Sequence, residues 1–348
     1  MRIALFGFGS LGRALLAAAA AMPDVTVATI VDHAPGLAGT AVEGPAGSLT
    51  VAPRLPPAAA PTVLFHATTS DPERATAEIV AALEAGYAVV SAAEWLFHPW
   101  LRFPRAAEAI DRAARAAGRA ALGCGINPGF CFEALPILAA RTLARVDRFD
   151  ILRISNVSGV GPSDFAHLGF GLDEATFRAR VADGAIEGHM GFPESVAALA
   201  ECTGVAIDAI EDRLAALPAR RPVTLAHRTV AEGEAVAITQ VATGFRAGAA
   251  VITMTLEMHL DPEFYGRTPR EAVRIEGSRT LALDIAPAAP PVPGAAAMML
   301  HAARALGALP PGLASPLDLP AGGSGPTRRL SAGPAARDGS GSRFALAG

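Results

Sequence analysis

The sequence predicts an α/β protein with a doubly wound parallel sheet of the Rossmann type, followed by a second, α+β domain. Three observations predict this fold. Apolar strands and helices alternate in the first part of the chain, a glycine-rich turn separates the first strand from the first helix, and partly alternating strands take over further along. The 348 residues also exceed the usual size of one compact domain.

Residues 1–133 form the expected dinucleotide-binding domain. Their strands are continuous apolar runs, as in a parallel sheet that is covered on both faces. Pro72 suits the first turn of one helix, and Gly86 and Gly118 suit the ends of two. Strands are predicted at 3–6, 25–31, 62–68, 87–93 and 120–125, and helices at 11–22, 70–86 and 104–118.

Residues 134–292 form the expected second domain, which would contact the substrate and a second subunit. Helices are predicted at 135–143 and 173–184. The remaining apolar segments have the pattern of an antiparallel sheet packed on these helices. Its strands are predicted at 149–160, 234–248, 250–260 and 280–287.

The end of the chain divides into two parts. The apolar stretch within 293–320 is expected to be a helix that returns to the first domain and completes it. Residues 321–348 are rich in glycine, serine, proline and alanine, so a disordered tail is expected there.

Composition limits the partners and the compartment. A formal net charge of -4 gives no basic surface for nucleic acid. Three glycines and Arg13 interrupt the apolar N-terminal stretch, and no other run has membrane-spanning length, so a cytoplasmic protein outside the membrane is expected. The three cysteines lack C-x-x-C spacing and are interpreted as free thiols, and the eight scattered histidines suggest no metal site.

One absence narrows the chemistry. The sequence has no lysine, and all its basic side chains apart from histidine are arginines. A Schiff-base lysine or a lysine general acid is therefore impossible.

The turn after the first strand carries the pattern G-x-G-x-x-G at Gly7, Gly9 and Gly12. The first glycine permits the turn, the second lets the backbone approach a pyrophosphate, and the third allows close helix packing. Because the motif follows a strand and opens a helix, it predicts dinucleotide binding rather than a purely structural turn. The residues between these glycines, Phe8, Ser10 and Leu11, are included in the site.

Asp32 ends the second strand, twenty residues beyond Gly12. A carboxylate here can accept hydrogen bonds from the adenosine ribose hydroxyls, which favours NAD over NADP because it would repel a 2′-phosphate. Arg13 could offset that repulsion, so NADP stays possible. The alternative is that Asp32 only caps a turn.

Three polar residues follow later strands at the same predicted sheet edge. Thr68 and Thr69 are candidates to bond the nicotinamide ribose or phosphate, and helix capping is the alternative for both. Asn127, in the loop GINPG, is either a turn former or a contact to the carboxamide.

Glu94 is the candidate catalytic residue. It lies directly after a predicted strand, at the edge where doubly wound sheets bind ligands, and the nearby Trp95, Phe97 and Trp100 could form an apolar pocket around it. The alternative is a glutamate at a helix start that faces water.

Residues 170–201, with G-x-P-E-S at 191–195, resemble the substrate domain of the 2,4-diaminopentanoate dehydrogenases and the related native amine dehydrogenases. The glycine turn, Glu94, GINPGF and two later segments, 271–285 and 310–320, fall in the order of that family. The resemblance covers roughly residues 1–320. Residues 286–306 depart from it, with prolines and alanines in place of a polar Gly-Asp turn and with His301 in a helix where the family commonly has an asparagine.

The resemblance implies an enzyme in which Glu94 is the catalytic acid and a nicotinamide cofactor serves to interconvert an amine with a carbonyl compound and ammonia. It also implies a homodimer. His189 is a candidate for the substrate pocket, and Phe130 and Asn156 are lesser candidates. The missing lysine excludes the amino acid dehydrogenases and dihydrodipicolinate reductases that depend on one.

Three functions remain open at this point. The first is an NAD(P)-dependent amine dehydrogenase for a small ketone, aldehyde or amine. The second is a 2,4-diaminopentanoate dehydrogenase, for which Arg153, Arg178 or Arg246 could bind the substrate carboxylate. The third is a dinucleotide-binding protein without catalysis.

Overall fold

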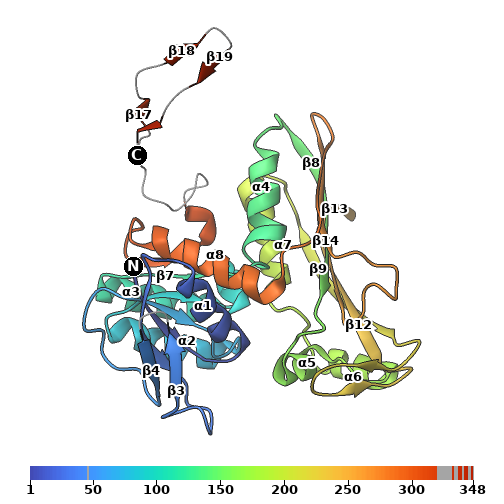
Figure 1. Ribbon diagram of the computed structural model, residues 1–348. Helices are drawn as coiled ribbons and strands as arrows, with labels where there is room; N and C mark the ends of the chain where they lie inside the picture. Colours follow the sequence, from blue (N-terminus) through green and yellow to red (C-terminus); the bar gives the residue numbers. More distant parts are fainter. Residues whose placement is uncertain (45–46, 320–330, 333–335, 339–340, 344–345, 348) are drawn as a thin grey trace.

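The computed structural model describes residues 1–44, 47–319, 331–332, 336–338, 341–343 and 346–347. Its two large sheets lie beside each other, with α8 between the first sheet and α4 (Figure 1). The first sheet is built from residues 2–123 and completed by a strand at 312–314, after the chain has formed the second sheet. Within the described residues, no helix is long and apolar enough to cross a membrane.

The first sheet has the order β16-β7-β6-β5-β1-β2-β4-β3. All neighbours are parallel except the hairpin of β3 and β4, which the sequence analysis did not predict. The chain builds one side of β1 first and then the other, so the loops after β1 and β5 flank the point where the strand order reverses. The predicted doubly wound sheet is confirmed. Its strands are β1 Arg2–Phe6, β2 Thr26–Val31, β3 Ala41–Gly44, β4 Gly47–Ala52, β5 Val63–His66, β6 Ala88–Ser91, β7 Ala120–Gly123 and β16 Gly312–Ala314.

Helices cover both faces of this sheet. Successive residues of β1 alternate between two apolar clusters: Ile3 and Leu5 pack with α1 and α8, and Ala4 packs with α2 and α3. The returning helix α8 therefore lies on the first sheet, beside α1. The helices are α1 Ser10–Ala20, α2 Pro72–Glu84, α3 Pro104–Ala117 and α8 Pro291–Leu306.

The second sheet has the order β15-β14-β8-β13-β12-β9. The expectation of a purely antiparallel sheet is wrong at one pair, because β8 and β13 run parallel. The β12–β13 hairpin sets the direction of β13, and the long connection after β8 leaves that strand free to match it. The edge strand β9 was not predicted, since its half-exposed side chains lack an apolar run. The strands are β8 Val146–Asn156, β9 Ala209–Pro218, β12 Ala235–Arg246, β13 Ala249–His259, β14 Arg270–Gly277 and β15 Leu281–Ile285.

Helices α4 and α7 cover one face of the second sheet (Figure 1). Phe132, Phe149 and Phe192 are buried in the core between them and the strands. The helix predicted at 135–143 already ends at Ala140, where the chain turns. The helices are α4 Leu135–Ala140, preceded by a π-helical turn at Phe130–Ala134, then α5 Pro162–Leu168, α6 Glu174–Ala182 and α7 Phe192–Thr203.

Short elements complete the described chain. A small hairpin joins β10 (Val223–Thr224) to β11 (Thr229–Val230). In the tail, β17 (Ser331–Ala332) pairs with β20 (Leu346–Ala347), and β18 (Ala336–Asp338) pairs with β19 (Gly341–Arg343). The rest of 321–348 lies outside the described residues, and the predicted disorder of this tail stays a prediction.

The start of α7 joins the two halves of the molecule. Gly191 adopts the left-handed φ of +95°, and a Cβ there would lie 2.9 Å from the Glu94 carbonyl oxygen and 3.0 Å from Pro128 Cγ. Two loops of the first domain therefore pack directly against Gly191. Only a residue without a side chain fits at this position.

Glu194, three residues further along, has no exposed side-chain surface. Arg102 Nε and Nη2 donate to its two carboxylate oxygens at 2.6 and 2.9 Å. This bidentate ion pair ties the segment after Glu94 to α7 and compensates a buried charge.

Glu133 is a second fully buried carboxylate at this junction. Ser195 Oγ and the Gly129 amide donate to its oxygens, so it links α7 to the loop 125–129. Burial raises the pKa of Glu133 to about 7, although these hydrogen bonds act in the opposite direction.

We predict that Arg102→Ala destabilises the protein markedly, because it leaves Glu194 buried without its cation. The expected loss is about 3 kcal/mol of unfolding free energy. Arg178→Ala is the matched control, since Arg178 pairs with Glu174 on the surface of α6 and its removal should change little. Urea denaturation measures both; equal effects would contradict the assigned role of Arg102.

We also predict a pH-dependent effect of Glu133→Gln. Because the folded-state pKa of Glu133 lies above its ordinary value of 4.5, its proton stabilises the fold below pH 4.5, and this stabilisation is lost as pH rises through about 7. Glutamine can still accept from Gly129 and donate to Ser195 but has no proton to lose. Its unfolding free energy relative to wild type should therefore rise between pH 4.5 and 7, by on the order of 2 kcal/mol.

Denaturation of both proteins at several pH values gives that difference directly. The exposed Glu174→Gln serves as the control and should show a constant offset. A constant offset for Glu133→Gln as well would show that this carboxyl group is already ionised at pH 4.5.

Candidate active site

Glu94 and His189 meet between the two halves of the molecule. Glu94 follows β6 and opens a short 3-10 helix, Glu94–Phe97, whereas His189 precedes α7 in the second part of the chain. His189 Nδ1 lies 2.8 Å from Glu94 Oε1. The two side chains are 15% and 27% exposed, respectively, so both remain in contact with solvent.

The contact between these two side chains is mainly one of charge. His189 Nδ1 is close to the carboxylate but has no well-directed hydrogen bond. Burial by itself would lower the pKa of His189, yet the charge of Glu94 and its hydrogen-bonding capacity outweigh this effect and raise it. The Glu94 carboxylate thus stabilises the protonated imidazole relative to the neutral form.

The aromatic residues near Glu94 do not form the expected pocket. Trp95 and Phe97 are buried in the first domain, where the Trp95 indole donates to the Ser70 carbonyl at 3.0 Å. Trp100 is 48% exposed. The Glu94 carboxylate instead contacts the His189 imidazole, and its charge also acts on Asp164.

The three glycines of the first turn have three different environments. A Cβ on Gly7, whose φ is +98°, would lie 2.3 Å from the Ala67 carbonyl oxygen, and one on Gly12 would lie 2.2 Å from the Gly7 carbonyl oxygen. At Gly9, by contrast, a Cβ would meet nothing within 4 Å. Gly7 and Gly12 thus permit tight packing, and Gly9 leaves its surroundings open.

The open space at Gly9 lies at the N-terminus of α1. No side chain caps this helix, and its first turn contains no acidic residue. Free amide groups and the positive end of the helix dipole suit an anion, so the turn fits the pyrophosphate of a dinucleotide. Ser10 and Leu11 begin the helix, and Phe8 packs its ring into the core.

Asp32 is already engaged within the chain. Its two carboxylate oxygens accept hydrogen bonds from the amides of Phe8 and Ala34, both at 2.7 Å. The turn-capping alternative is therefore realised, and any contact to a ribose would use the remaining lone pairs of the same oxygens.

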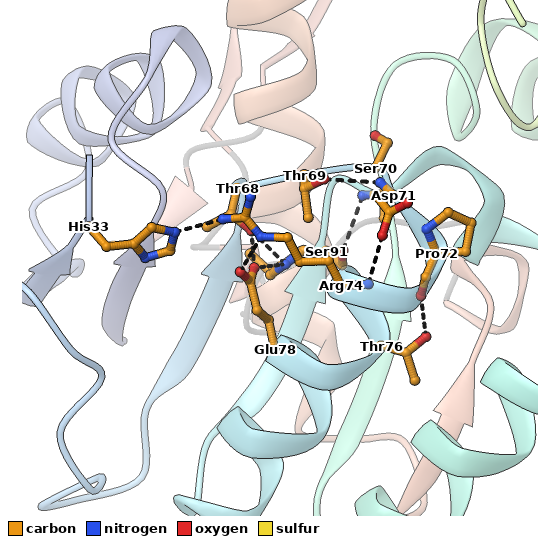
Figure 2. Close-up of polar contacts among 12 residues, drawn as sticks. His33, Thr68, Thr69, Ser70, Asp71, Pro72, Arg74, Thr76, Glu78 and Ser91 are labelled. Carbon is orange, nitrogen blue, oxygen red and sulfur yellow. Dashed lines mark hydrogen bonds and ion pairs between the residues drawn. The ribbon is translucent and has the colours of Figure 1, made fainter. Parts of the chain in front are cut away.

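Thr68 and Thr69 also make local contacts. The Thr68 hydroxyl lies 2.8 Å from His66 Nε2 and donates to Glu78 Oε2, whereas Thr69 Oγ1 accepts from the Asp71 amide at 3.0 Å (Figure 2). Asp71 in turn caps α2 by accepting from the Arg74 amide. The helix-capping alternative is therefore realised by Asp71, and Thr69 forms a local turn before it.

Arg74 extends this network toward Asp32. Its guanidinium donates to Glu78 Oε1 at 2.8 Å and lies 2.6 Å from Nε2 of His33, the residue after Asp32 (Figure 2). Burial alone would raise the pKa of Glu78, but hydrogen bonds from His66, Thr68 and Arg74 lower it to about 2. A half-exposed cation therefore stands beside the end of β2.

The remaining predicted residues are not gathered around Glu94 by any described contact. Asn127 precedes the cis peptide to Pro128 in the loop that presses on Gly191. Phe130 lines a separate cleft of about 1140 Å³ between α4 and α8. Asn156 ends β8, and its Oδ1 accepts from the Ser158 amide at 2.9 Å, which forms a local turn.

Of the three arginines considered for a substrate carboxylate, two are paired and the third is exposed. Arg153 is 1% exposed and pairs with Glu271, with a further bond to the Ala289 carbonyl at 2.8 Å. Arg178 pairs with Glu174 on the surface of α6. Arg246 ends β12 and is exposed.

Metal ligands and disulfides were not expected, and the described residues contain neither a cluster of metal-binding side chains nor a bonded cysteine pair. The sequence analysis missed Arg102, Glu133 and Gln240, whose side chains hold the loops of the site. Arg102 and Glu133 are charged residues close to expected site loops, and that proximity was the available signal. Gln240 gave none, because it lies within an apolar strand.

Comparisons with known proteins agree with this architecture. The chain matches the model of the 2,4-diaminopentanoate dehydrogenase C-terminal domain over residues 130–325. It is 28% identical over 237 residues to the 2,4-diaminopentanoate dehydrogenase of Acetoanaerobium sticklandii, a match that spans 67% of this chain and 66% of that enzyme.

Solved structures show the same fold. An amine dehydrogenase from Mycobacterium smegmatis superposes with a TM-score of 0.78 at 18% identity, covering 92% of this chain and 96% of that one. A mutant meso-DAP dehydrogenase from Clostridium tetani gives 0.51 at 13% identity, with 94% and 97% covered. Because the family model matches more than half of the chain, this protein belongs to the 2,4-diaminopentanoate dehydrogenase family.

Proposed function

We propose that the protein is an NAD(P)-dependent amine dehydrogenase. It reductively aminates a small ketone or aldehyde with ammonia and catalyses the reverse oxidative deamination. The observation that carries the proposal is the pair of Glu94 and His189, which is held beside the cofactor edge of a Rossmann-type sheet in a chain without lysine. Family membership supports the same reaction.

A carboxylate suits this chemistry. Amination passes through a carbinolamine and an iminium cation, so Glu94 can accept protons from ammonium and stabilise the positive charge that develops on the substrate. His189 keeps the carboxylate in place and, when protonated, can donate to the carbonyl oxygen as it leaves as water. The bound nicotinamide supplies or accepts the hydride at the substrate carbon.

Support for a dinucleotide comes from the geometry of the first turn. The open space at Gly9 and the uncapped start of α1 suit the pyrophosphate, with backbone contacts expected from Phe8, Ser10 and Leu11. We assign Thr68, Thr69 and Asn127 to the nicotinamide half through their position after β5 and β7.

NAD is the proposed main cofactor, with NADP also accepted. The carboxylate of Asp32 lies where the adenosine ribose is expected, which disfavours a 2′-phosphate. Arg74, beside His33, provides a cation that reduces this penalty.

The occupied arginines favour a substrate without a carboxylate. Arg153 and Arg178 are paired with Glu271 and Glu174, and Glu94 has Asp164 as a negative neighbour, whose pKa rises through partial burial and the charge of Glu94. A simple amine or ketone therefore fits better than 2,4-diaminopentanoate. Phe130, Asn156 and His189 remain the proposed substrate contacts.

A homodimer in the cytoplasm completes the proposal. Described helices cover only one face of the second sheet, so its other face can meet a second copy (Figure 1). Light scattering in solution measures the subunit number, and a monomer at micromolar concentration would refute the dimer.

A substrate panel tests the function. NADH oxidation is followed with ketones, aldehydes and oxo acids, each with and without ammonium. In the reverse direction, pentan-2-amine and 2,4-diaminopentanoate form a matched pair that differs in the carboxylate and the second amine. Faster turnover of 2,4-diaminopentanoate would support the second candidate function, and ammonium-independent reduction would exclude amine dehydrogenation.

We predict that Gly9→Ala weakens NADH binding at least tenfold but leaves the fold intact. The added methyl group meets no protein atom within 4 Å, so it projects into the space assigned to the pyrophosphate. Gly307→Ala is the control, because its surroundings are equally open and it lies at the end of α8. Fluorescence titration with NADH and thermal melting distinguish the two; unchanged affinity in Gly9→Ala would place the cofactor elsewhere.

We predict that Glu94→Gln lowers kcat for amination by about 10²- to 10⁴-fold, the usual range for a general acid or base. The variant keeps the shape of the side chain but removes its charge, while the dissociation constant of NADH should stay within twofold. Rapid-mixing kinetics and NADH fluorescence give both values. Retention of more than a tenth of the wild-type turnover would rule out proton transfer by Glu94.

A further inference from the structure

Gln240 is a polar side chain at a buried position. It lies in the middle of β12, is 0% exposed, and has the fully buried Ile238 and Ala242 two residues away on the same face of the strand. A buried amide is costly unless its hydrogen-bonding groups are satisfied. The partners of Gln240 therefore indicate why an amide occupies this position.

Two of these partners are the backbone amide and carbonyl groups of His189, and the third is Asp212. Gln240 Oε1 accepts from the His189 amide at 2.7 Å, and Nε2 lies 3.3 Å from the His189 carbonyl oxygen. Nε2 also donates to Asp212 Oδ2 on β9 at 2.8 Å. Because the Asp212 carboxylate only accepts and the His189 amide only donates, a single orientation of the Gln240 amide satisfies both.

The backbone before His189 fits closely against this amide. Gly188 adopts a φ of +68°, and a Cβ there would lie 2.7 Å from Gln240 Oε1 and 2.3 Å from Leu214 Cδ2. The His189 ring stacks nearly parallel to Phe192, with the ring centroids 6.4 Å apart. The residue is thus held through its backbone by Gln240, and its ring points toward Glu94.

We propose that Gln240 is a positioning residue, which holds the His189 backbone so that the imidazole stays against Glu94, with Asp212 fixing the direction of the amide. The inference rests on the proposed function, since it assumes that Glu94 and His189 form the reacting pair. Glycines at 184, 188 and 191 all have positive φ, and the buried Ile186 and Met190 anchor the segment on either side of Gly188, so Gln240 fixes the backbone between these anchors. When a mutation far from the reacting atoms shifts a catalytic group by about 1 Å, the rate can fall on the order of 10²-fold.

Charged groups on several elements affect the imidazole. Glu94 on the 3-10 helix and Glu133 on the π-helical turn favour its protonated form, whereas Arg153 on β8 opposes it. Displacement of the ring from Glu94 removes the nearest of these carboxylates. The pKa of His189 should then fall toward its ordinary value, which gives a readout that loss of stability alone would not produce.

The test compares Gln240→Leu with Asp212→Asn. Leucine keeps the volume but loses both contacts to His189, so kcat for amination should fall about 10- to 100-fold, with the dissociation constant of NADH within twofold of wild type. Asparagine can still accept from Gln240 Nε2, so Asp212→Asn should stay within about threefold. Thr239→Val, at the next position on the same strand and therefore on its opposite face, is the control.

A second measurement does not depend on activity. NMR titration of histidine-labelled protein, with His189 assigned through His189→Asn, should show a lower pKa for His189 in Gln240→Leu than in wild type. Gln240→Met, which has a similar volume and likewise loses both contacts to His189, is used if the leucine variant unfolds. An unchanged His189 titration in whichever of these two variants folds would overturn the positioning role. Absence of ammonium-dependent turnover in wild type would instead refute the proposed function alone.

Discussion

The arrangement of the candidate site depends on the buried start of α7. Glu194 takes a charge out of water, and the bidentate contact from Arg102 compensates it, so the segment after Glu94 is fixed to the second domain. At the next residue, Ser195 donates a hydrogen bond to Glu133, which also accepts one from the Gly129 amide in the loop 125–129. Three short motifs of the sequence are thereby joined at a single helix end.

This junction explains how a carboxylate and an imidazole from different domains can stay in contact. Glu94 and His189 are each attached to short loops, and loops alone would allow the pair to separate. The ion pair of Arg102 fixes one loop, and the amide of Gln240 fixes the other. Partial burial then makes the charge interaction stronger than it would be in water, which is why the pKa of His189 is raised despite desolvation.

Local patterns predicted those features that depend on neighbours in the sequence. The glycine turn, the alternation of strands and helices, and the position of Glu94 after β6 could all be read in this way. Contacts between remote segments could not. Asp32 looked like a free ribose ligand, yet it accepts two backbone amides, and Arg153 looked available for a substrate but is paired with Glu271 in the core.

The sequence by itself determined the class of the protein, because strand and helix periodicity report which faces are buried and because the absence of lysine excludes a lysine-dependent site. Only the tertiary structure decided which polar groups are left for a ligand. Hydrogen bonds and ion pairs between distant residues use up donors and acceptors, and their geometry follows from sheet register and helix packing rather than from spacing along the chain. That packing brings Glu94 into contact with His189, and it places Gln240 where its side chain accepts from the His189 amide.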